Sequence, residues 1–78
     1  MKLYVALKLR DGIRLSHFDI PGGLGDAETE IMIQEKLVES DHFHKAKLVG
    51  WNTDKNELEQ FMQQRYGSFF KGEMDNTS

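Results

Sequence analysis

The sequence predicts a small α+β domain with the element order β-β-α-β-α, in which two helices cover one face of a three-stranded mixed sheet. Three observations support this architecture. Residues 1–18 alternate between apolar and polar side chains on both sides of an Asp-Gly pair, which is the pattern of a β-hairpin. Residues 27–39 and about 54–66 have helical spacing. Between them, residues 42–51 return to a strand-like pattern.

The opening hairpin can be closed by two kinds of loop. A two-residue Asp11-Gly12 turn is the strongest short-range hairpin signal, but it places apolar and charged residues on the same face of both strands. A three-residue loop over 10–12 places Gly12 where a left-handed residue is needed. It also aligns the apolar residues, in the pairs Leu9 with Ile13, Leu7 with Leu15, and Val5 with His17, and it pairs Lys8 with Arg14 on the other face. We therefore predict the three-residue loop.

Length and composition indicate one domain, folded over residues 1–67. Residues 68–78 are expected to be a tail that is either partly disordered or a short edge strand. The chain has no cysteine, so its stability must come from packing or self-association rather than from disulfides. We find no signal-peptide pattern and no segment able to span a bilayer, and we expect a cytoplasmic protein.

The net charge of −3 is unevenly distributed along the chain. Residues 1–18 contain four lysines and arginines against one aspartate, whereas residues 19–41 contain seven acidic residues against one lysine. The predicted hairpin is therefore basic and the first predicted helix acidic. Such asymmetry bears on interaction and solubility rather than on the fold.

The first helix, 27–39, is expected to follow a glycine-rich connector and a cap at Asp26. The core-facing stripe of this helix is predicted to contain Ala27, Ile31, Ile33, Leu37 and Val38. Thr53 or Asp54 is expected to cap the second helix, and Gly67 to end it. The order of hairpin, helix and third strand is shared with the β-grasp (ubiquitin-like) fold, but no motif specific to that family is present.

Several residues invite a chemical interpretation, although none forms a complete motif. The loop 21–26 has the glycines of an anion cradle, but it lacks the Gly-Lys-Ser/Thr ending of a nucleotide loop and leads into an acidic helix. His42 and His44 point the same way on a strand, but their spacing matches no established metal motif. No serine has an evident base beside it. We therefore expect no cofactor and no catalytic activity, with a small metal- or anion-binding protein as an alternative.

The face of the sheet turned away from the helices is the predicted binding surface. It is expected to display aromatic and basic side chains together, namely Tyr4, Lys8, Arg14, Phe18, Phe43, Lys45, Lys47 and Trp51. Aromatic residues and arginine are the usual anchors of protein interfaces. The sequence thus favours a non-catalytic interaction or regulatory module that binds a protein partner or a second copy of itself. Replacing Trp51 or Phe18 by alanine should then weaken binding without unfolding the domain.

Two alternatives concern the same residues, and a further possibility concerns the first helix. The aromatic rings could stack on bases while the lysines follow the phosphates, as in single-strand nucleic-acid-binding modules. The pair Phe69-Phe70 could instead fold over the face and seal it. The acidic first helix could provide a second contact surface, for a basic partner.

Overall fold

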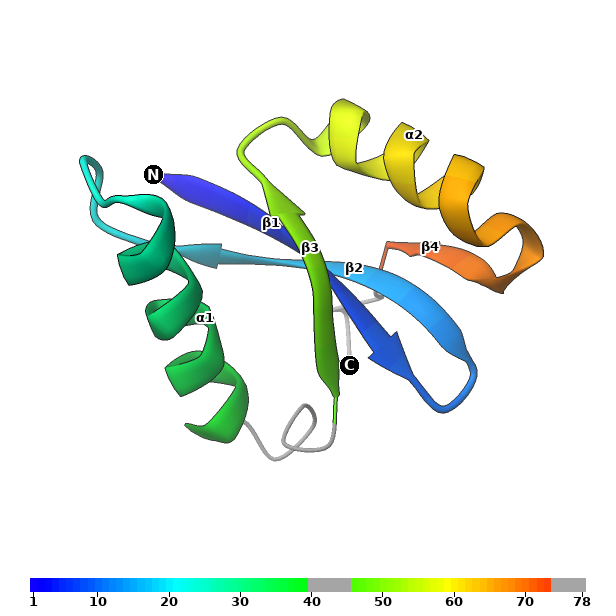
Figure 1. The fold of residues 1–78 in the computed structure, drawn as a ribbon, viewed down its shortest axis with the longest axis horizontal. Helices are drawn as coiled ribbons and strands as arrows, with labels where there is room; N and C mark the ends of the chain where they lie inside the picture. The colour runs from blue at the N-terminus through cyan, green and yellow to red at the C-terminus, as the bar shows by residue number, and fades with distance from the viewer. Residues whose placement is uncertain (40–45, 74–78) are drawn as a thin grey trace.

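The computed structural model describes residues 1–39 and 46–73, which form one four-stranded sheet with a helix on each face (Figure 1). The elements are β1 (Lys2–Leu9), β2 (Gly12–Asp19), α1 (Asp26–Glu39), β3 (Lys47–Asn52), α2 (Lys55–Tyr66), the 3-10 turn η1 (Gly67–Phe69) and β4 (Phe70–Glu73). The predicted α+β class and mixed sheet are confirmed. The predicted number of three strands is wrong, because β4 adds a fourth strand beside β2.

The order of strands across the sheet is β3-β1-β2-β4. β1 runs antiparallel to both of its neighbours, β2 and β3, while β4 runs parallel to β2. It follows that β2, β3 and β4 all point the same way and that β1 alone points the other way. The third strand lies beside the first, as the sequence predicted.

The hairpin register differs from the predicted one. Leu9 pairs with Gly12 across a two-residue turn, Arg10-Asp11, so neither of the loops considered from the sequence is present. Relative to the predicted register, every residue of β1 faces a partner one position earlier on β2. Val5 therefore lies opposite Ser16 rather than His17, and Lys8 lies opposite Ile13 rather than Arg14.

This register divides the apolar residues of the hairpin between two faces. Neighbouring residues of a strand point to opposite faces, and directly paired residues point to the same face. Leu7 pairs with Arg14 and Leu15 pairs with Ala6, so the leucines of the two strands lie on opposite sides of the sheet. Both leucines are almost completely buried. Neither face of this sheet can therefore be left in water.

Each helix covers one of these faces. α1 packs on the first face, in a core cluster of Leu3, Val5, Leu7, Ile20, Ile33 and Leu37. α2 packs on the second face, in a cluster of Ala6, Ile13, Leu15, Leu58 and Met62. The prediction that both helices lie on one face is wrong, because it assumed that the hairpin has a single apolar face. Figure 1 shows the two helices on either side of the sheet.

The handedness of the connections between strands also requires one helix on each face of the sheet. Both β2–α1–β3 and β3–α2–β4 join parallel strands, and they cross the sheet in opposite directions. Crossovers between parallel strands are almost always right-handed. Two crossovers of the same hand that run in opposite directions must place their helices on opposite faces.

A β-bulge in the edge strand β3 lets its side chains reach both the α1 cluster and the α2 cluster. The register with β1 shifts between Ala6, which pairs with Gly50, and Leu7, which pairs with Leu48. Val49 is the additional residue, and it packs with the α2 cluster, whereas Leu48 packs with the α1 cluster. Such a bulge lets one strand direct side chains to positions that strict alternation would not allow.

Two caps of α2 agree with the prediction. The Asp54 side chain accepts hydrogen bonds from the backbone N–H groups of Asn56 and Glu57 at 3.0 and 3.4 Å. Gly67 ends the helix with φ = 56°. Asp26, by contrast, is the first residue of α1 rather than its cap, since the carbonyl of Gly25 accepts the bond from the Thr29 N–H.

Gly12 lets the end of the chain approach the hairpin. Its φ of +137° is rarely adopted by residues with a side chain, and a Cβ at this position would overlap the carbonyl oxygen of Phe69. The glycine thus allows η1 and β4 to dock beside the start of β2. Lys55 Nζ donates a hydrogen bond of 2.8 Å to Glu73 Oε2 and ties the start of α2 to the other end of β4.

We expect Gly12→Ala to lower the free energy of unfolding by about 1–3 kcal/mol, through backbone strain and overlap with Phe69. Gly22→Ala is the matched control, because nothing lies within 4 Å of the added methyl group and no left-handed backbone is required. It should change stability by no more than about 0.5 kcal/mol. Urea unfolding measures both variants. Equal stability of the two would contradict the docking of η1 against Gly12.

We also expect the Lys55–Glu73 pair to depend on pH. The hydrogen bond from the Lys55 ammonium holds the pKa of the Glu73 carboxyl below its ordinary value of 4.5. The pair therefore contributes stability above that pH and loses it as the pH falls through the lower pKa of the folded state. A carboxyl titration followed by NMR should show the depressed pKa and its return towards 4.5 in Lys55→Gln. Lys36→Gln, on α1, should leave the Glu73 titration unchanged.

Candidate functional site

The structure divides the predicted aromatic–basic face between the two faces of the sheet. Phe18 and Trp51 pack against the α1 cluster. Tyr4 packs against the α2 cluster, and Lys8 and Lys47 pair with one another on that same side. The prediction of one shared face is therefore wrong, for the same reason as the predicted register. Whether these residues bind a partner remains a prediction.

The remaining residues of the predicted set are Arg14, Phe43 and Lys45. Arg14 lies opposite Leu7, and its guanidinium donates two hydrogen bonds, of 2.8 and 3.0 Å, to Asp11 Oδ2. These bonds lower the pKa of the Asp11 carboxyl. Phe43 and Lys45 lie outside the described residues.

The division of the aromatic and basic residues between two faces also weakens the nucleic-acid-binding alternative. That alternative needs aromatic rings and lysines on one open surface, so that bases stack while phosphates are neutralised. Phe18 and Trp51 are instead half-buried beneath α1, on the side opposite to Lys8 and Lys47. The arrangement on which the alternative rested is not present among the described residues.

The outer side of α1 carries the most prominent exposed apolar surface on a helix. Ile31 is 57% exposed and Val38 75% exposed, and together with the exposed Ala27 they follow one line along the helix. They are part of a shallow groove of about 660 Å³. We define the α1 outer surface as the residues that line this groove: Ala27, Glu30, Ile31, Gln34, Glu35, Val38 and Glu39.

The predicted core-facing stripe of α1 is wrong in part. Ile33 and Leu37 face the sheet, as predicted, but Ala27, Ile31 and Val38 face away from it. The helix thus carries two apolar stripes on different sides. The signal was present in the sequence, because at 3.6 residues per turn the centre of the group Ala27, Ile31 and Val38 lies about 120° around the helix from that of Ile33 and Leu37.

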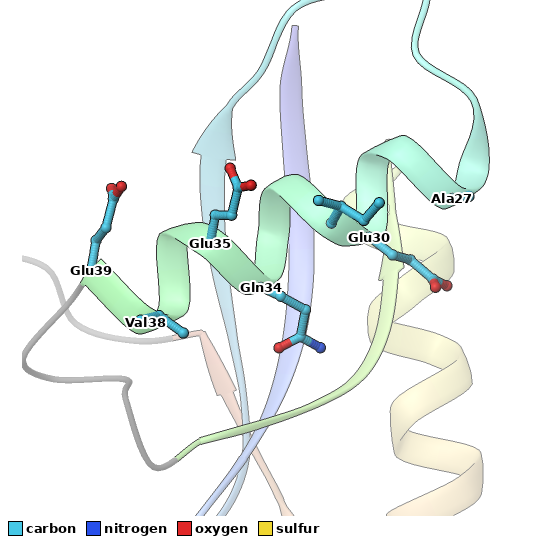
Figure 2. A pocket seen from close by; sticks show the side chains of 7 residues that line it. Ala27, Glu30, Gln34, Glu35, Val38 and Glu39 are labelled. Atoms are coloured by element: carbon cyan, nitrogen blue, oxygen red, sulfur yellow. The ribbon is translucent and has the colours of Figure 1, made fainter.

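Carboxylates flank the exposed stripe on both sides. At helical spacing, Glu30 lies on one flank, and Glu35 and Glu39 lie on the other. Figure 2 shows Glu35 and Glu39 pointing to one side of the helix and Gln34 and Val38 to another. Over its whole length α1 has five acidic residues and one lysine. The α1 outer surface is thus apolar along its centre and negative along its margins.

Trp51 connects this surface to the sheet. Its indole N–H donates a hydrogen bond of 3.4 Å to Glu30 Oε1, and its ring packs against the α1 cluster. Lys36, on the other side of α1, lies with its ammonium 6.0 Å from the centre of the Phe18 ring. Trp51 and Phe18 thus contact α1 on the two sides of its buried stripe. The stripe with Ile31 and Val38 remains exposed.

Within 1–39 and 46–73 no three His, Asp, Glu or Cys side chains are grouped closely enough to hold a metal ion. His17 Nδ1 is buried there without a hydrogen-bond partner, and its ring lies 6.1 Å from that of Tyr4. His42 and His44 lie outside the described residues.

None of the helices in the described part of the chain has both the length and the apolar character needed to cross a membrane. Comparison with protein families, with curated proteins and with solved structures gave no significant match.

The structure changes what we expect from replacing Trp51. Because the ring packs against the core beneath α1, Trp51→Ala should lower the free energy of unfolding by about 2–4 kcal/mol. Phe61→Ala is the control: this ring is 52% exposed on α2, and its loss should cost less than about 1 kcal/mol. Urea unfolding followed by circular dichroism compares the two. A fully stable Trp51→Ala variant would restore the original view of Trp51 as a purely binding residue.

Proposed function

We propose that this chain is a non-catalytic interaction module that binds a basic, amphipathic segment of a protein partner through the α1 outer surface. The observation that carries the proposal is the exposed stripe with Ile31 and Val38 on a helix that already buries a second apolar stripe. A cysteine-free domain of this size fits the cytoplasm as its compartment.

Ile31 and Val38 are not part of the core cluster that packs α1 against the sheet. Ile33 and Leu37 pack α1 against the sheet, and both are almost completely buried. Polar residues at 31 and 38 would leave that packing unchanged. Exposed apolar residues rimmed by charges mark interaction sites on proteins more often than single exposed leucines do.

The charges favour one kind of partner. Glu30, Glu35 and Glu39 line both margins of the groove, and none of the described residues that line it is basic. A partner helix with apolar residues along one side and lysines or arginines beside them would match both features. Helices commonly bind apolar grooves in this way, through residues spaced three and four apart.

The test uses a synthetic amphipathic helical peptide of leucine and lysine, with a scrambled peptide of the same composition as its control. NMR amide shifts should change along α1 with the amphipathic peptide and not with the scrambled one. The double variant Ile31→Ser, Val38→Ser should weaken binding at least about tenfold. Phe61→Ser, which changes an exposed apolar residue on α2, should bind as the original chain does.

Two results would overturn the proposal. The first is a peptide that binds elsewhere, or that binds the double variant unchanged. The second is a dimer, detected by sedimentation velocity, that the double variant dissociates. In that case the α1 outer surface is the interface with a second copy rather than the site of a basic partner.

A further inference from the structure

A second hollow lies at the turn of the hairpin, on the side of the sheet opposite to α1. It has a volume of about 250 Å³ and lies between the hairpin and the end of α2 with η1. We define the hairpin-end pocket by its lining residues: Lys8, Leu9, Arg10, Gly12, Ile13, Tyr66 and Phe69. The close approach that Gly12 permits brings the two sides of this pocket together.

The walls of the pocket combine apolar and basic groups. Leu9, Ile13, Tyr66 and Phe69 provide aliphatic and aromatic surface, and Phe69 is 67% exposed. Among the described residues that line the pocket, the charged ones are Lys8 and Arg10, both of them cations. A ligand would therefore meet an aromatic wall and two positive charges at once.

These two cations have no counterion within residues 1–39 and 46–73. The nearest carboxylate along the chain, Asp11, is already paired with Arg14 at 2.8 Å. Lys8 lies directly opposite Lys47 on β3, and like charges paired across strands are unfavourable. An anion bound beside Lys8 would relieve this repulsion.

We propose that the hairpin-end pocket binds a small organic carboxylate whose apolar part is an aromatic ring or a short hydrocarbon group. The planar guanidinium of Arg10 matches a carboxylate with two parallel hydrogen bonds, and Lys8 adds a second charge. The volume of about 250 Å³ is smaller than the roughly 300–1,000 Å³ of ordinary ligand pockets, so the apolar part is limited to about the size of one ring. This site is separate from the α1 outer surface and does not depend on its function.

The carboxylate could belong to a free organic acid or to the last residue of a polypeptide. Two probes represent these sources: 4-phenylbutyrate for the free acid and N-acetylphenylalanine for the chain terminus. Their neutral amides serve as matched controls. Each compound is titrated at millimolar concentration into the isotope-labelled protein while the backbone amide shifts are followed.

We expect at least one of the two acids to shift the amides of Lys8, Arg10, Gly12 and Phe69, and the amides of α1 to remain in place. Lys8→Gln and Arg10→Gln should each weaken that binding about fivefold, and added salt should weaken it further. Both side chains are exposed, so neither change should unfold the domain. Lys2→Gln, at the other end of β1, should bind like the original chain. The acid that binds more tightly identifies the source.

The proposal is overturned if neither acid shifts the pocket amides. It is also overturned if a neutral amide binds as well as its acid, or if Lys8→Gln and Arg10→Gln leave binding unchanged. Because these outcomes concern amides far from α1, they are distinguishable from failure of the peptide experiment on the α1 outer surface.

Discussion

The offset between β1 and β2 determines on which side of the sheet each apolar side chain lies, and the rest of the structure depends on it. Leu3, Val5 and Leu7 occupy one face, while Ile13 and Leu15 occupy the other. A sheet that is apolar on both faces needs a layer on each side. With strand connections of one hand, the chain provides these layers by sending α1 and α2 across the sheet in opposite directions.

This arrangement covers each face of the sheet with only one helix. Nothing in the described residues packs on the outer side of α1, so the fold places no demand on that side beyond helix formation. Isoleucine and valine are weaker helix formers than alanine, glutamate or lysine. Their presence at Ile31 and Val38 is thus explained neither by packing nor by propensity. This is the physical reason for regarding the α1 outer surface as a binding surface.

Local patterns predicted the elements better than they predicted the arrangement. The alternation of residues 1–18, the helical spacing before Glu39 and the caps at Asp54 and Gly67 all depend on nearby residues, and the structure contains these elements. The hairpin register was wrong, because aligning apolar residues across strands assumes a sheet with one buried face. The prediction that Phe18 and Trp51 lie on an open surface was wrong for the same reason. The exposed stripe of α1 was missed because Ala27, Ile31 and Val38 were assigned to the same face as Ile33 and Leu37.

The α1 outer surface is negative and the hairpin-end pocket is positive, and the two lie on opposite sides of the sheet. Each therefore favours a ligand of a different charge. A basic partner suited to α1 is repelled by Lys8 and Arg10, and a carboxylate suited to the hairpin-end pocket is repelled by the α1 carboxylates. The surfaces also complement each other, so copies could associate head to tail. Such a heterologous contact between different faces extends into an open chain unless its rotation happens to close a ring. Because the two surfaces lie on opposite sides of the sheet, a single pair of copies cannot form both contacts at once, so each surface is better matched to a separate ligand than to the other surface of a second copy.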